Sequence, residues 1–317
     1  MAQQNASQPV TELSVDTEIN TGSSLDQPLD RLEAFHNHRG LLFSIAYRML
    51  GSAADAEDIL QETYIRWQQS HDFEIRSPKA FLVTIATRLC INHLQSARVK
   101  REEYFGSWLP EPVLTDFMDK SLFASPADES LSVAFLMLLE RLTPPERAIF
   151  ILHEVFDYEY PQIAQILELS EANCRQVLHR ARQHLKAGRP RFEAPRKKQE
   201  ELIENFLQAS AQGDMQGLLA MFSKDIVLYA DGGGKATAVP NPIYGSDNVA
   251  RFVLGGRKKF VPAEVVSRIA QVNGRPGIVT YLHGSPFAVI SMEISEGVIR
   301  NIYIVRNPDK LARLPIM

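Results

Sequence analysis

Cationic side chains recur at helical spacing along residues 171–186, a pattern suited to binding nucleic acid. The charged face comprises Arg175, Gln176, His179, Arg180, Arg182 and Lys186. The apolar face comprises Cys174, Leu178, Ala181 and Leu185, which would pack inward. Such a helix suits the major groove of DNA, because phosphates attract its charges and arginine can bond guanine edges in bidentate fashion. The alternative is a structural helix with a solvated basic face.

The residues before this helix predict a helix-turn-helix motif. A short helix from Pro161 to Leu167 is followed by a turn at residues 168–170, and the small Ala164 stands where two helices would cross. Upstream, residues 143–146 (TPPE) form a capping box with proline in the first turn, which is a strong helix start. Because the second helix of this motif enters the major groove, the basic helix is predicted to read DNA.

Acidic side chains line one face of an earlier predicted helix, which Ser52 caps. Asp55, Asp58 and Glu62 share this face, while an apolar stripe on the other side runs to Trp67. Taken alone, the pattern fits either a docking surface for a basic partner or a plain solvated face.

The candidates for catalysis are Asp231 and His283, which could act inside a cavity of the C-terminal part. Asp231, however, begins a Gly-Gly-Gly loop, where aspartate ordinarily forms turns, and His283 is followed by Gly284. The glycine run also lacks the spacing of a phosphate-binding P-loop. We therefore predict no catalytic residue, no cofactor and no metal site.

The elements that position these residues fall into separate segments. A length of 317 residues predicts two or three domains. Two segments are dense in amphipathic helix pattern. The last begins with helices and continues with alternating strands, which predicts a curved antiparallel sheet. The predicted segments are a disordered tail (1–27), a helical domain (28–101), an acidic linker (102–127), a helix-turn-helix domain (128–187), a basic linker (188–198) and an α+β domain (199–317).

Composition and charge exclude several classes of protein. No apolar run approaches the ~20 residues of a membrane span, and the N-terminus has no signal-peptide pattern. Cys90 and Cys174 lie in apolar helical patterns and are interpreted as buried thiols of a reducing compartment. The net charge is only −4, yet nine Lys and Arg against one Glu gather in residues 175–198. We expect a cytoplasmic, DNA-binding protein without membrane contact.

Two stretches together resemble the sigma factors of bacterial RNA polymerase. Residues 55–67 (DAEDILQETYIRW) resemble the second helix of sigma region 2, and residues 139–186 resemble sigma region 4. They occur in the order found in extracytoplasmic-function (ECF) sigma factors, which lack region 3. The resemblance covers roughly residues 28–190, and the combination is far more specific than either motif alone.

The resemblance implies partners and residue roles. RNA polymerase core, through its β′ and β subunits, would bind Asp55, Asp58, Glu62 and Trp67. The −10 promoter element would meet His71, Phe73, Arg88, Asn92 and Arg98. Phe73 is the aromatic candidate for stacking an extruded base, and a core anchor is the alternative for this residue. The −35 element would be read by the charged face of residues 171–186. The acidic linker, including Glu111, would thread the polymerase active-site channel; a linker without such a role is the alternative.

Three further segments resemble the ECF subgroup that carries a fused C-terminal domain of the SnoaL/NTF2-like kind. They are residues 108–112 (WLPEP), 231–235 (DGGGK) and 307–311 (NPDKL). The resemblance implies two all-α sigma domains followed by an α+β cone, which could hold a small ligand. Regulatory contacts are expected at Trp108, Asp231, Gly232, Gly233, Gly234, Lys235, Asn307, Pro308, Asp309 and Lys310.

The leading hypothesis is an ECF sigma factor that directs promoter-specific initiation and is regulated by its own C-terminal domain. One alternative is a helix-turn-helix activator with a ligand-sensing domain, which leaves the region-2-like helices of residues 28–101 unexplained. Another is a SnoaL-like enzyme with a DNA-binding module, which lacks a catalytic constellation.

Overall fold

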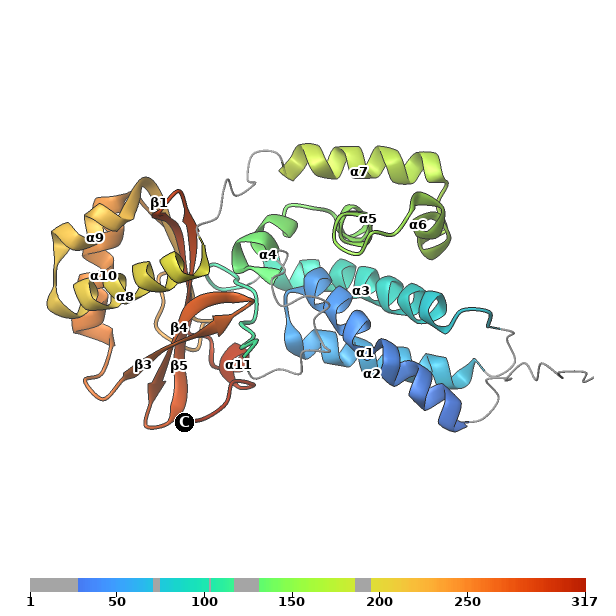
Figure 1. Cartoon of the computed structure of the whole chain (residues 1–317), viewed down its shortest axis with the longest axis horizontal. Coiled ribbons are helices and arrows are strands. Elements are labelled where there is room, and N and C mark those ends of the chain that lie inside the picture. Colours follow the sequence, from blue (N-terminus) through green and yellow to red (C-terminus); the bar gives the residue numbers. More distant parts are fainter. Residues whose placement is uncertain (1–27, 71–74, 103, 117–130, 186–194) are drawn as a thin grey trace, which may run out of the picture.

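The computed structural model describes residues 28–70, 75–102, 104–116, 131–185 and 195–317. Figure 1 shows two helical domains side by side with an α+β domain. We call residues 28–102 the first helical domain, 131–185 the second helical domain, 195–317 the C-terminal domain and 104–116 the linker. Within these ranges no helix is both long and apolar enough to span a membrane. The predicted tail and most of the predicted basic linker lie outside the described residues.

The first helical domain consists of α1 (Pro28–Leu50), α2 (Ala53–Gln69) and α3 (Pro78–Glu102). Gly51 ends α1 with a φ of +67°, a conformation that favours glycine. The Ser52 hydroxyl then caps α2 by accepting a hydrogen bond from the Asp55 amide at 3.1 Å. Both features agree with the sequence prediction.

The second helical domain consists of α4 (Val133–Leu139), α5 (Pro144–Glu154), α6 (Tyr160–Leu167) and α7 (Glu171–Leu185). The Glu146 carboxylate accepts a hydrogen bond from the Thr143 amide at 3.0 Å, which confirms the predicted helix start. Glu168, with a φ of +56°, ends α6 in the left-handed region and turns the chain into α7. The predicted helix-turn-helix is therefore confirmed as α6 and α7.

The two helical domains share one apolar core. α1 packs against α5, and α3 packs against both α5 and α6. Figure 1 shows α5 and α6 lying above α3. At this junction the buried Arg147 donates from Nη1 to the Met49 carbonyl at 2.7 Å and pairs with Glu140. The two domains are thus held in a closed arrangement.

The C-terminal domain is a six-stranded sheet with three helices on one side and the short α11 on the other. Its helices are α8 (Arg196–Gln212), α9 (Met215–Met221), α10 (Ser246–Phe260) and α11 (Pro308–Leu311). Its strands are β1 (Phe222–Asp231), β2 (Ile243–Tyr244), β3 (Val266–Val272), β4 (Arg275–Leu282), β5 (Ser285–Ser295) and β6 (Val298–Val305). The predicted α+β cone is confirmed.

Two details of the predicted cone are wrong. The sheet order is β2-β1-β6-β5-β4-β3, and the neighbouring strands β1 and β6 are parallel rather than antiparallel. In addition, α10 comes between β2 and β3, so the helices do not all precede the strands. The periodicity of a strand indicates its buried face but not its partner or direction, which the path of the chain decides.

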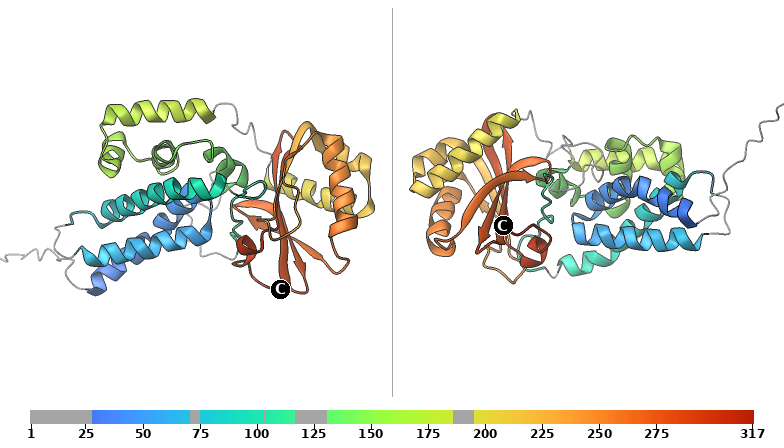
Figure 2. Two further views of the ribbon diagram at one scale, coloured as in Figure 1. Left: turned by 180° about the vertical axis from the view of Figure 1, so that it is seen from behind. Right: turned by 60° about the horizontal axis from the view of Figure 1, so that its bottom comes forward.

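The two faces of the sheet have different coverings. Ile278 and Ile302 pack into the cone beneath α8, α9 and α10. Their neighbours Val279 and Tyr303 point the other way and pack against Leu109 of the linker. The alternation follows from the two-residue period of a strand. Figure 2 shows the linker and α4, the first helix of the second helical domain, lying between this outer face and the other helices of the two helical domains.

Candidate functional site

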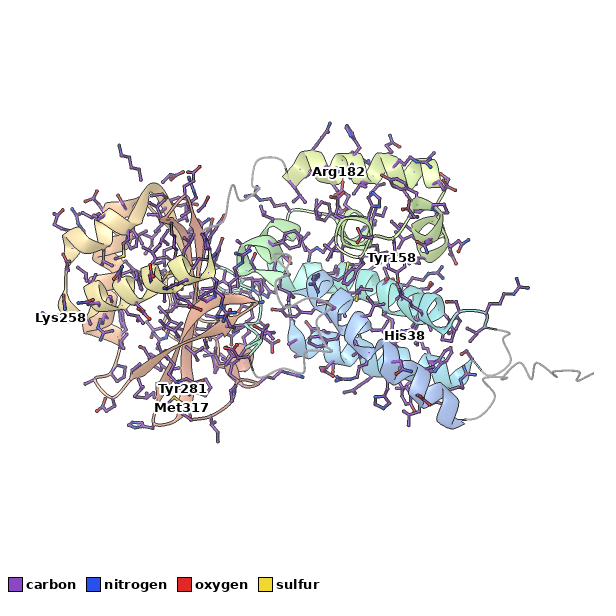
Figure 3. The ribbon with its side chains drawn as sticks, in the orientation of Figure 1. His38, Tyr158, Arg182, Lys258, Tyr281 and Met317 are labelled. Atoms are coloured by element: carbon purple, nitrogen blue, oxygen red, sulfur yellow. The ribbon has the colours of Figure 1, made fainter. Side chains whose placement is uncertain are left out.

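The charged face of α7 is open to solvent. The exposed residues are Arg175, Gln176, His179, Arg180 and Arg182, while Lys186 lies outside the described residues. Figure 3 labels Arg182 on α7. The apolar stripe of Cys174, Leu178, Ala181 and Leu185 is buried, as predicted. The helix therefore presents a cationic surface to solvent and an apolar surface to the core.

Neighbouring helices orient two of these arginines. Arg175 pairs with Glu171 at 2.8 Å and lies over the Tyr160 ring, 5.0 Å from its centroid. Arg182 donates from Nε to Glu154 of α5 at 2.9 Å. Exposed pairs of this kind contribute about 0–1 kcal/mol, so a phosphate can displace the carboxylate at little cost. Val177 is buried beside the stripe and does not share the charged face.

The acidic face of α2 is accessible at two of its three predicted positions. Asp58 is exposed, and Glu62 pairs only at the surface with Arg66, at 2.7 Å. Asp55 lies against α3, with its Oδ2 3.6 Å from Nε2 of His93. Asp58 and Glu62 are therefore the acids best placed to meet a partner.

Trp67 corrects the prediction for α2. Its ring is fully buried, and its Nε1 donates to the Arg31 carbonyl at 2.9 Å. The Arg31 guanidinium lies 4.3 Å from the ring centroid. This side chain is part of the core and does not reach a surface that a polymerase could contact, because its large apolar area is removed from water there.

The structure describes the side chains of only two of the residues predicted to meet a −10 element, Arg88 and Asn92. His71 and Phe73 lie outside the described residues, as does the side chain of Arg98, whereas Asn92 is exposed on α3. Arg88 donates to the Ile166 carbonyl at 2.8 Å and pairs with Glu168 at 2.9 Å. In the closed arrangement α6 therefore occupies the Arg88 guanidinium, and its predicted contact with DNA stays a prediction.

The linker is packed, not extended. Glu111, expected to thread a channel, is buried and accepts hydrogen bonds from the Ala54 amide at 3.1 Å and the Ser52 hydroxyl at 3.2 Å. Burial raises the pKa of this carboxyl, whereas the bonds from the N-terminus of α2 favour its charged form. Here Glu111 helps cap α2, and threading the channel, which stays a prediction, would require it to leave this site.

Asp231 joins the linker to the C-terminal domain. Its fully buried carboxylate accepts hydrogen bonds from the Tyr104 hydroxyl at 2.6 Å and the Leu109 amide at 2.9 Å. Lys310 pairs with the same carboxylate at 2.7 Å, and the Asn307 amide group donates to the Tyr104 hydroxyl at 2.9 Å. A buried charge is stable only when paired and hydrogen-bonded, so these groups depend on one another. We call Tyr104, Leu109, Asp231, Asn307 and Lys310 the clamp.

Trp108 extends the clamp to the first helical domain. Its ring lies 4.4 Å from the Lys310 ammonium on one side. It also lies against Gly51, where a Cβ atom would come within 2.6 Å of the indole. A glycine is therefore needed at position 51 both for the left-handed backbone that ends α1 and for the close approach of the Trp108 ring.

The remaining residues of the two predicted contact segments have a different role. A Cβ on Gly232 or Gly233 would clash within the domain, and Gly234 approaches Phe105 of the linker. Lys235 and Asp309 form an exposed pair at 2.6 Å inside the C-terminal domain, and Pro308 is exposed. The linker is therefore not held by Lys235, Asp309 or Pro308, which only shape their own segments. The prediction that these three residues are regulatory contacts is corrected.

Asn273 was not among the predicted contact residues, although its side chain forms hydrogen bonds with three separate parts of the chain. It donates to the Tyr47 hydroxyl at 2.6 Å and the Leu131 carbonyl at 3.1 Å, and accepts from the Val113 amide at 3.1 Å. In sequence it belongs to an Asn-Gly pair, which indicates a hairpin turn and nothing more. Its φ of +53° is the conformation of that turn.

We expect Asn273→Ala to loosen the linker. Removing one partner from buried hydrogen bonds costs about 1–3 kcal/mol, because the groups left behind stay desolvated. Hydrogen exchange of residues 108–116 is expected to accelerate in the variant. Asn248→Ala is the control, since that exposed side chain donates to the Tyr244 carbonyl within its own domain. Unchanged exchange in Asn273→Ala would contradict the assignment.

Asp231 and His283, the two candidates for catalysis that the sequence offered, do not share a site. The Asp231 carboxylate lies in the clamp, on the outer face of the sheet, and His283 is exposed in the turn between β4 and β5. Neither lines the cavity of the cone. Across the residues that the structure describes, no cluster of three or more His, Cys, Asp or Glu could hold a metal ion.

Comparison with known proteins agrees with this architecture. Residues 34–99 match the family model for Sigma-70 region 2, and residues 132–185 match that for Sigma-70, region 4. The chain is 35% identical over 300 residues to the ECF RNA polymerase sigma factor SigJ of Mycobacterium tuberculosis, covering 91% of this chain and 94% of that protein. It is 29% identical over 281 residues to the probable ECF RNA polymerase sigma factor SigI of that species, covering 88% and 93%. The crystal structure of SigJ aligns with a TM-score of 0.73 at 32% identity, covering 91% of this chain and 100% of that chain.

Proposed function

This chain belongs to the ECF family of RNA polymerase sigma factors, and we propose that its C-terminal domain controls how its two helical domains reach a promoter. It carries sigma regions 2 and 4, as promoter-directed initiation requires. Its partners are accordingly RNA polymerase and promoter DNA. The proposed place of action is the cytoplasm, where these partners meet.

The −35 element is assigned to α7. The exposed stripe of Arg175, His179 and Arg182 supports this assignment, because it lies opposite the buried stripe of a helix-turn-helix. The −10 element is assigned to region 2, with Asn92 exposed on α3 and Arg88 reaching DNA once it leaves α6. The β′ subunit is the proposed partner of Asp58 and Glu62.

Replacing Arg175 or Arg182 by alanine is expected to weaken binding of a cognate −35 element by about 1–3 kcal/mol. Arg180→Ala is expected mainly to remove a contact with a DNA phosphate, so that binding depends less steeply on salt concentration. Footprinting of the holoenzyme measures the protection. Arg300→Ala is a charge-matched control, since Arg300 forms a similar ion pair with Glu296 on β6. Unchanged protection in all three α7 variants would remove α7 from the −35 contact.

Control by the C-terminal domain rests on the clamp. Asp231 binds the linker that joins regions 2 and 4, and Asn273 binds region 2 itself. Arg88 bound to α6 and the shared core of the two helical domains indicate a closed state. Two DNA elements separated along a promoter require the two regions to move apart. The proposed control is therefore a bias toward the closed state, exerted through the linker.

The deciding experiment is transcription in vitro from a cognate promoter by core polymerase and this chain, with no other sigma factor present. Initiation at the correct start site is the expected result. A helix-turn-helix activator would need a sigma factor in the same reaction. No transcript with this chain alone, and a transcript once a sigma factor is added, would therefore favour that alternative.

A further inference from the structure

A cavity of about 320 Å³ lies inside the cone, between the inner face of the sheet and the helices that cover it. Its walls are mostly apolar, with Phe206, Phe252, Ile278 and Ile302 among them. An engineered apolar cavity of ~150 Å³ stays dry and binds benzene. A cavity of about twice that size with a similar lining favours an apolar guest over water.

The charged groups of the lining have one sign. Arg257 and Arg306 line the cavity, and none of the lining residues is acidic. Among the described residues, no carboxylate pairs with either arginine, although other arginines such as Arg39 and Arg300 form ion pairs with glutamates. An anionic guest would complement this lining.

Arg306 is the better placed of the two arginines. It follows β6 on the cavity side, and its guanidinium lies over Phe287, 4.4 Å from the ring centroid. Nη1 donates to the Thr237 carbonyl at 2.8 Å, whereas Nε is buried without a hydrogen-bond partner. Burial lowers the pKa of this guanidinium, because its charge is partly desolvated. A buried donor left unpaired costs free energy that a ligand could recover.

We propose that the cone binds a small carboxylate whose apolar body fills the cavity and whose charge pairs with Arg306. The two carboxylate oxygens match the planar donors of a guanidinium and would satisfy Nε. A neutral apolar guest would leave Nε unpaired. A dianion such as a phosphate monoester would bring a second charge into apolar surroundings, where uncompensated charge is costly.

The mouth of the cavity suits such a ligand. Phe260 and Val261 belong to the lining and are 40% and 36% exposed, an unusual position for large apolar side chains. The last turn of α10 beside them carries Arg257, Lys258 and Lys259. Figure 3 shows Lys258 at the end of the molecule away from the helical domains. An amphiphilic anion would therefore meet apolar surface and positive charge together, on a side that the linker leaves open.

The ligand site and the clamp lie on opposite faces of the same sheet. Arg306 lines the cavity, and its backbone amide donates to the Asp231 carbonyl at 2.7 Å. Asp231 itself points outward to the linker. Binding can therefore be measured on its own, and its result does not depend on whether the clamp regulates transcription.

The test is titration calorimetry of the full chain with octanoate and, in parallel, with 1-octanol. Gly256→Leu is the blocking variant, because Gly256 lines the cavity and its added Cβ would meet nothing nearer than Phe252 at 4.0 Å. Gly255→Leu is its matched control on the same helix, where the added Cβ has no neighbour within 4 Å and the residue is not part of the lining. Arg306→Gln tests the anchor, and Arg257→Gln tests the other arginine of the lining. Arg251→Gln is the matched arginine control, because Arg251 is exposed on the same helix and is not part of the lining.

We expect the chain to bind octanoate at least tenfold more tightly than 1-octanol. Arg306→Gln is expected to remove that preference, Gly256→Leu to remove binding, and both controls to bind like the original chain. Unfolding curves of each variant check that the domain is intact. Binding of neither compound, equal affinity for both, normal binding by Gly256→Leu, or a preference that depends on Arg257 in place of Arg306 would each overturn the proposal.

Discussion

Replacing Asp58 and Glu62 together by lysine is expected to lower affinity for RNA polymerase core by ~100-fold or more, because like charges placed across an interface cost several kcal/mol. Both side chains lie on the open face of α2 and neither packs in the core. The double reversal should leave region 2 folded. Its local cost is the repulsion between Arg66 and the lysine that replaces Glu62, about 0.2–0.5 kcal/mol for a like-charge pair four residues apart on a helix. Co-purification with core polymerase measures the loss.

The charge change itself needs a control. Glu201→Lys with Glu204→Lys alters the net charge by the same amount on two exposed positions of α8, in the C-terminal domain. This control is expected to bind core polymerase normally. If the α2 variant also co-purifies at normal yield, the acidic face is only a solvated surface and the docking site lies elsewhere.

Replacing Asp231 by alanine is expected to raise transcription from a cognate promoter by roughly 5–150-fold, the usual range of a coupling between sites. The variant leaves Lys310, the Tyr104 hydroxyl and the Leu109 amide without their common acceptor. Breaking a buried ion pair from one side typically costs about 3–5 kcal/mol, so the linker should detach. Trimming the chain from Asn307 onward removes Lys310 as well and should act in the same direction.

The measurement is transcription in vitro with matched amounts of each protein, together with protease cleavage of the linker. Lys235→Ala is the control, because Lys235 lies in the same segment but pairs with Asp309 at the surface. It should behave like the original chain. Equal output from all variants would remove the regulatory role, and lower output from a detached linker would mean that the clamp activates the protein.

The helices could be read from the sequence because their signals are local. Gly51 with Ser52, the capping box at Thr143 and the apolar spacing of α7 each act within a few residues, and each was confirmed. The charged face of α7 followed from the same spacing, since a helix that buries one stripe exposes the opposite one. The order of the two sigma-like segments likewise identified the family.

Which partner each face meets was decided only by the tertiary structure. The sequence around three predicted contact residues gives no sign of their partners within the chain. The structure shows that Trp67, Glu111 and Arg88 each bind another element of the chain. The bond from Asn273 to Tyr47 joins residues 226 positions apart. No local pattern encodes such a contact, because hydrophobic period specifies which side of an element avoids water and leaves open what covers it. The cavity beside Arg306 has the same origin: strands and a helix from separate stretches enclose it, and only their packing leaves the space unfilled.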